Sequence, residues 1–151
     1  MEPYNNVPRV AMQVTQGCLV VSIQFELTDQ VLRRIQHDVL ECVRKTEVTG
    51  VTFDLSSVDV IDAHEFEALR RIIIMIALLG AKTVLVGLRP GVVFALVDLD
   101  VDTTGVDTAL NLEDAVRVLQ ASPSSEGEPS RHKQDYADGK QDDSLSDRKG
   151  R

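Results

Sequence analysis

The chain alternates between two kinds of hydrophobic pattern, and this alternation limits the folds it can adopt. Short apolar runs such as TVLVG, residues 83–87, are typical of buried strands. In contrast, LTDQVLRRIQHDVLECVRKTE, residues 27–47, repeats apolar side chains near every 3.6 residues, as a helix with one buried face does. Strands that alternate with helices require crossover connections, which make most of the strands parallel. The pattern therefore predicts an α/β domain.

The predicted order of elements is β-β-α-β-α-β-α-β-α. Strands are expected at 9–14, 18–25, 51–55, 83–87 and 105–109, and helices at 27–47, 63–79, 90–98 and 112–120. The short link TQG between the first two strands predicts an antiparallel hairpin. The expected fold is therefore a mixed, mainly parallel sheet with flanking helices.

Several predicted helices begin at residues suited to capping. Thr28 and Asn111 are suited to N-cap positions, and Asp62 with Glu65 three residues later matches a capping box. Pro90 suits the first position of a helix, where its missing N–H costs nothing.

The run IIIMIALL, residues 72–79, is the longest apolar stretch, and Gly80 behind it suits a helix end. A helix that is apolar on all sides is either buried within its own domain or packed on a partner. Both alternatives stay open from the sequence.

Composition excludes several classes of protein. The 151 residues carry a net charge of −8, which disfavours nucleic-acid binding and a polybasic membrane patch. Residues 1–9 lack the apolar core of a signal peptide, and eight apolar residues are too few to span a bilayer. Cys18 and Cys42 lie within apolar patterns and are predicted to be buried free thiols in a reducing compartment. We therefore expect a cytoplasmic protein.

Composition changes sharply near the C-terminus. Residues 121–151 contain one Leu, one Tyr and no Ile, Val or Phe, too little apolar surface to offset the entropy of folding. The predicted organisation is an N-terminal lead at 1–8, a folded domain at 9–120 and a disordered polar tail at 121–151.

Signals for catalysis are weak. GLRPG, residues 87–91, could hold a phosphate at a helix N-terminus, but a turn with proline at the first helical position explains it better, and no Walker lysine is present. Asp54, Asp59 and Asp62 could form a site for a hard metal ion, but a helix cap and two solvated turn acids explain them better. We therefore expect no catalytic residues, no metal and no cofactor.

Together, LVVSIQFELTDQ, DLSSVDVID, LLGAK and VGLRPGV resemble the STAS family, the anti-sigma-factor antagonist fold. Within this family they are most similar to the single-domain scaffold of the bacterial stressosome. The resemblance covers roughly residues 8–120 and implies no catalysis. It implies binding to a serine/threonine switch kinase and assembly with sensor STAS paralogues into a homo- or hetero-oligomer.

The resemblance also implies control by phosphate on a hydroxyl directly after the ID pair, where this chain has Ala63. The alanine is either natural to a non-switching variant or replaces a serine. Ser56 and Ser57 are alternative acceptors, although both also suit a turn. The expected partner-binding surface comprises Asp59, Asp62, His64 and Glu65.

Two further functions remain open. A simple antagonist would bind an anti-sigma factor one-to-one. A small nucleotide-binding α/β domain would use GLRPG.

Overall fold

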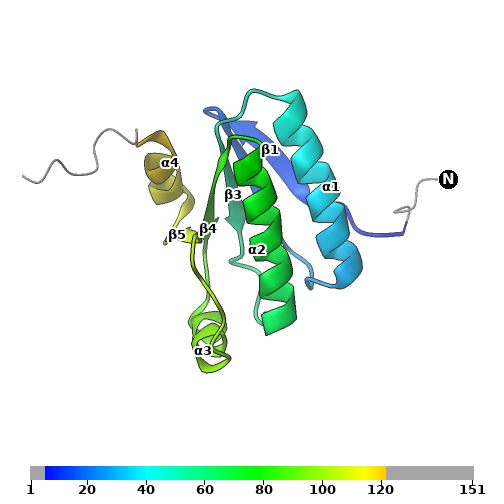
Figure 1. Ribbon diagram of the computed structural model, residues 1–151, viewed down its shortest axis with the longest axis vertical. Coiled ribbons are helices and arrows are strands. Elements are labelled where there is room, and N and C mark those ends of the chain that lie inside the picture. Colours follow the sequence, from blue (N-terminus) through cyan, green and yellow to red (C-terminus); the bar gives the residue numbers. More distant parts are fainter. Residues whose placement is uncertain (1–5, 122–151) are drawn as a thin grey trace, which may run out of the picture.

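The computed structural model describes residues 6–121, and the elements follow the predicted order (Figure 1). They are β1 (Ala11–Thr15), β2 (Cys18–Ser22), α1 (Asp29–Lys45), β3 (Gly50–Asp54), α2 (Ala63–Leu78), β4 (Lys82–Val86), α3 (Pro90–Asp98), β5 (Asp107–Ala109) and α4 (Leu112–Gln120). Residues 1–5 and 122–151, which include nearly all of the predicted tail, lie outside the described part.

The strands form one sheet in the order β1-β2-β3-β4-β5. β1 and β2 are antiparallel and connected by Gln16 and Gly17, whose φ angles of 50° and 75° belong to a tight hairpin turn. The remaining neighbours are parallel, which confirms the mixed, mainly parallel sheet.

Predicted strand ends are wrong by up to three residues, because a strand lasts only as long as its neighbour offers partners. β2 ends at Ser22 rather than at 25, opposite Asp54 at the end of β3. The two short helices at 90–98 and 112–120 begin and end as predicted.

Helices cover both faces of the sheet. α1 and α2 lie on one face, and α4 lies on the other (Figure 1). Between α1, α2 and the sheet lies the main core, which includes the fully buried Phe53 and Leu85. A smaller cluster beneath α4 contains Val84, Val86 and Ala115. α3 sits at one end of the sheet, beyond the end of β4.

The predicted caps are confirmed. Thr28 accepts a hydrogen bond from the backbone N–H of Val31 at 3.3 Å, and Asn111 accepts one from Asp114 at 2.9 Å. Pro90 opens α3.

The apolar run at 72–79 is only partly buried. Ile72, Ile73 and Ile76 enter the core, whereas Ile74 is 46% exposed and Leu78 is 82% exposed. Burial within the domain therefore explains the apolar residues on one side of the helix, whereas those on the other side are exposed to solvent.

The two cysteines are free, but the prediction that both are buried is wrong for Cys42. Cys18 is buried in β2, and burial raises the pKa of its thiol. Cys42 on α1 is half-buried because it lines an open groove beside Val10 and Met12.

Within residues 6–121, no helix has the length and apolarity that crossing a bilayer requires.

Candidate functional site

The candidate site lies where the parallel strands β2, β3 and β4 end. The carboxyl ends of parallel strands meet at one edge of a sheet, and binding sites of open α/β sheets form there. Three connections gather at this edge, at residues 23–28, 55–62 and 87–89. We call these connections and the first turn of α2 the carboxyl edge.

A capping box fixes the start of α2. Asp62 Oδ1 accepts a hydrogen bond from the Glu65 N–H at 2.7 Å, and Glu65 Oε2 accepts one from the Asp62 N–H at 2.9 Å. Each carboxylate satisfies a backbone donor that the helix itself leaves free. Ala63 is the first residue of this helix and is exposed. A side chain at position 63 is therefore presented to solvent from a rigid support.

The turn after β3 is held by Asp54. Its Oδ1 accepts hydrogen bonds from the Ser56 N–H at 3.0 Å and from the Ser56 hydroxyl at 2.7 Å. Ser57 is exposed, and its hydroxyl has no partner among residues 6–121. The two serines therefore differ, because the hydroxyl of Ser56 is engaged and that of Ser57 is available.

Arg89 connects the β4–α3 connection to this turn. Its Nε donates to the Ser56 carbonyl oxygen at 2.8 Å, and its guanidinium pairs with Asp59. Gly87 lies against the same turn at φ 73°, where an added Cβ would come within 2.8 Å of Ser56 Cβ. These contacts hold the β3–α2 connection and the β4–α3 connection against each other.

A shallow groove of about 370 Å³ separates the β2–α1 connection from the β3–α2 connection. Phe25 is 42% exposed and Val60 is 75% exposed, and both line it. Its acidic lining residues are Glu26, Asp59, Asp62 and Glu65. Exposed apolar side chains beside ordered acids are typical of a protein-binding surface.

His64 does not join this groove. Its Nε2 lies 3.0 Å from Oδ1 of Asp29, the first residue of α1. It therefore links the two helices and lines a separate groove between them. The carboxyl edge brings Asp59, Asp62 and Glu65 together and directs His64 away from them.

The three aspartates have separate tasks. Asp62 caps α2 as predicted, whereas Asp54 and Asp59 are engaged by Ser56 and Arg89 rather than simply solvated. Among residues 6–121, no group of three or more His, Cys, Asp or Glu side chains is arranged to hold a metal ion.

A mixed sheet with one hairpin, helices on both faces and an acidic, partly apolar edge around a capped helix defines the class of this protein as an α/β domain. The chain belongs to the STAS domain family, whose family model matches residues 9–115.

One curated relative is a co-antagonist protein. The chain is 26% identical over 115 residues to the RsbT co-antagonist protein RsbRD of Bacillus subtilis (strain 168). The match covers 76% of this chain but only 41% of the length of that relative.

Solved structures agree with this relation. A serine-to-glutamate variant of RsbS from Moorella thermoacetica is 29% identical, with a TM-score of 0.64 over 74% of this chain and 95% of that one. A chain from a structure of the stressosome, described as a signal integration and transduction hub, is 28% identical. Its TM-score is 0.62, and the match covers 72% of this chain and 95% of that chain. The unphosphorylated anti-sigma factor antagonist SpoIIAA, at 15% identity and TM-score 0.58, shares the fold.

Sequence reasoning missed several features of the site and its surroundings. Phe25 and Val60 look like ordinary strand or loop hydrophobics in the sequence, because exposure depends on tertiary packing. Asp29 follows a cap residue and is unremarkable until His64 is seen beside it. The pairing of Arg89 with Asp59 spans 30 positions and leaves no local pattern.

Proposed function

We propose that this protein is a non-enzymatic scaffold that binds a serine/threonine switch kinase within a multiprotein stress-signalling complex. The carboxyl edge is the kinase-binding surface, and Ala63 occupies the position where the family resemblance implies a phosphorylated hydroxyl. The likeness to a co-antagonist of RsbT and to stressosome chains supports the partner class. The stressosome chain also supports assembly with STAS paralogues. The proposal places this assembly in the cytoplasm and involves no cofactor or nucleic acid.

The observation that carries the proposal is the exposed first residue of α2 on a rigid, capped support. A phosphoryl group at position 63 would add about −1.5 to −2 charges beside Asp59, Asp62 and Glu65. The N-terminus of a helix favours an anion, so the helix itself would tolerate this group. The added charge and bulk would instead act on a bound partner.

Because alanine has no hydroxyl, the carboxyl edge remains in its unmodified form at this position. The protein would then hold the kinase without being released by phosphorylation at 63. Of the two alternative acceptors, Ser57 is favoured over Ser56, since the Ser56 hydroxyl already donates to Asp54.

A simple antagonist of an anti-sigma factor would use the same edge, and SpoIIAA supports only the shared fold for this alternative. A nucleotide-binding role for GLRPG is weaker, because Arg89 is already paired with Asp59 and bonded to the Ser56 carbonyl. Binding of ATP or GTP that depends on Arg89 would favour the nucleotide-binding alternative.

The test is to incubate the full chain with the switch kinase of the same organism and ATP, and to map phosphate by mass spectrometry. We expect no phosphate at position 63 in the chain as given, and phosphate at 63 in the Ala63→Ser variant, followed by release of the kinase. Ala77→Ser is the matched control, because Ala77 is an exposed alanine near the other end of α2. Efficient phosphorylation at Ser57 with release of the kinase would move the switch to that turn.

A further inference from the structure

The two outer edges of the sheet differ in how they are protected. β5 has only three residues and begins with Asp107, and both a short length and a charge discourage pairing with another strand. β1 has five residues, AMQVT, with no charge and no proline. Its outer edge carries backbone donors and acceptors that no strand within residues 6–121 pairs. An edge of this kind is a template for another strand.

The hairpin determines which residues of β1 offer these groups. A loop of two residues, Gln16 and Gly17, separates Thr15 from Cys18, which face each other across the hairpin. In such a hairpin the closing pair is hydrogen-bonded, and hydrogen-bonded pairs then alternate along the strands. Met12 and Val14 therefore direct their N–H and C=O groups outward.

We infer that β1 pairs with β1 of a second copy of this chain, antiparallel, about a two-fold axis at Gln13. This register places Met12 opposite Val14 of the other copy, with their backbone groups in bonding positions. Gln13 faces its own counterpart in a pair without backbone hydrogen bonds, where side chains come closest. The two sheets would become one continuous sheet with a self-complementary interface.

A groove of about 360 Å³ between α1 and β1 fits this arrangement. Met12 lines it and is 37% exposed, and Val14, two residues further on the same face, is 49% exposed. Since Val14 of the second copy lies opposite Met12, its side chain enters this groove. The docked copy thus covers apolar surface that the single chain leaves open.

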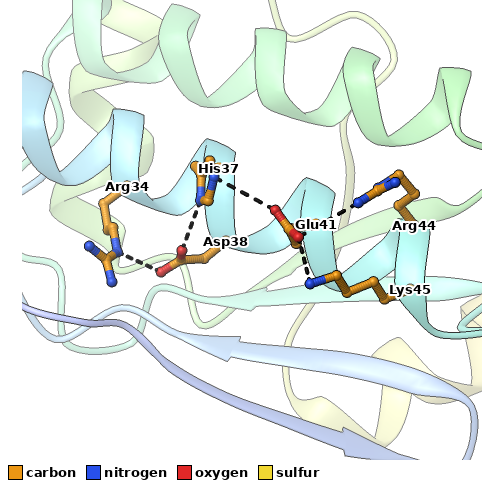
Figure 2. A network of polar contacts seen from close by, with 6 residues as sticks. All are labelled: Arg34, His37, Asp38, Glu41, Arg44 and Lys45. Atoms are coloured by element: carbon orange, nitrogen blue, oxygen red, sulfur yellow. Dashed lines mark hydrogen bonds and ion pairs between the residues drawn. The ribbon is translucent and has the colours of Figure 1, made fainter. Parts of the chain in front are cut away.

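The charges that α1 contributes to the groove are paired with one another, and Arg9 adds one positive charge from the segment before β1. Arg34 and Asp38 are 2.8 Å apart, and Lys45 and Glu41 are 2.6 Å apart. Figure 2 shows these pairs running along the helix above the hairpin. The lining therefore holds three basic and two acidic side chains, a net charge of +1 against −8 for the whole chain, and an uncharged strand can enter it without repulsion.

A second copy suits this edge better than the chain's own C-terminal segment. Residues 121–151 contain no Ile, Val or Phe and so lack the side chains that strands prefer. This inference does not depend on the proposed kinase binding, because the carboxyl edge lies at the strand ends and stays free.

The test is sedimentation equilibrium of the full chain with Gln13→Lys, Gln13→Glu and an equimolar mixture of the two. Gln13 is exposed, so neither change disturbs the isolated fold, which circular dichroism would verify. We expect a reversible dimer for the unmodified chain, and a dissociation constant raised about fivefold or more in each variant alone. The mixture should recover dimerisation, since Lys then faces Glu.

Gln30→Lys on α1 is the matched control and should dimerise normally. The rate at which Cys42, in the wall of the groove, is alkylated should fall as the concentration rises. A monomer at every concentration, or a dimer that neither Gln13 variant weakens, would overturn the inference.

Discussion

Replacing Gly87 by alanine tests whether the carboxyl edge is one packed unit. Gly87 has φ 73°, and a Cβ there would lie 2.8 Å from Ser56 Cβ, 3.0 Å from its backbone N and 3.1 Å from Asp54 Oδ1. Ser56 cannot retreat freely, because its N–H bonds Asp54 and its carbonyl accepts from Arg89. The substitution therefore adds a steric conflict to an unfavourable backbone conformation.

Gly105 supplies the matched control. Its φ is 78°, and an added Cβ would meet nothing within 4 Å. Left-handed strain alone costs about 1 kcal/mol, and overpacking adds about 1–3 kcal/mol. Gly87→Ala should therefore lower the free energy of unfolding by about 2–4 kcal/mol, against about 1 kcal/mol for Gly105→Ala.

Thermal and urea unfolding, followed by circular dichroism, would measure both variants. For a domain of this size, each kcal/mol of lost stability lowers the melting temperature by about 3–5 °C. We therefore expect the melting temperature to fall by about 10 °C for Gly87→Ala and by about 4 °C for Gly105→Ala. If Gly87→Ala costs no more than Gly105→Ala, then the two connections are not tightly packed and the reasoning fails.

Three smaller predictions follow. Lys45 holds the pKa of Glu41 below the ordinary value of 4.5, first by its hydrogen bond and then by its charge. The stability that the ionised Glu41 contributes is therefore present above pH 4.5 and is lost as the pH falls through the lowered pKa. Glu41→Gln should accordingly reduce the melting temperature at neutral pH but not at low pH. A difference in melting temperature between the variant and the unmodified chain that stays constant across pH would contradict this. Iodoacetamide should modify Cys42 before Cys18, which is buried and has a raised pKa; equal rates would show that β2 opens readily. Truncation after Gln120 should change the free energy of unfolding by less than about 1 kcal/mol. A larger loss of stability would show that the folded domain extends past Gln120.

The sequence predicts the features of this fold that arise from neighbouring residues. The capping box of Asp62 and Glu65 spans three positions, and its pattern is visible without any tertiary structure. The order of strands and helices follows from the change in hydrophobic period. The location of Ala63 at the first turn of α2 follows from the same local signals.

Features that depend on distant partners could not be predicted in this way. His64 meets Asp29 from 35 positions away, and Arg89 meets Ser56 from 33 positions away. Likewise, the half-exposed Cys42 and the exposed Leu78 lie in apolar patterns that resemble those of buried residues. Their exposure depends on which other elements pack against them, which local periodicity does not record.

The most direct test of the proposed function is the affinity of the switch kinase for the carboxyl edge, measured by isothermal titration calorimetry. The chain as given, Ala63→Glu and Ala77→Glu would be compared. A carboxylate at the start of α2 stabilises the helix by about 0.3–1 kcal/mol, so Ala63→Glu should remain folded. The proposal predicts tight binding to the unmodified chain, weaker binding to Ala63→Glu, and little change for Ala77→Glu. Equal affinity of the kinase for all three proteins would contradict it.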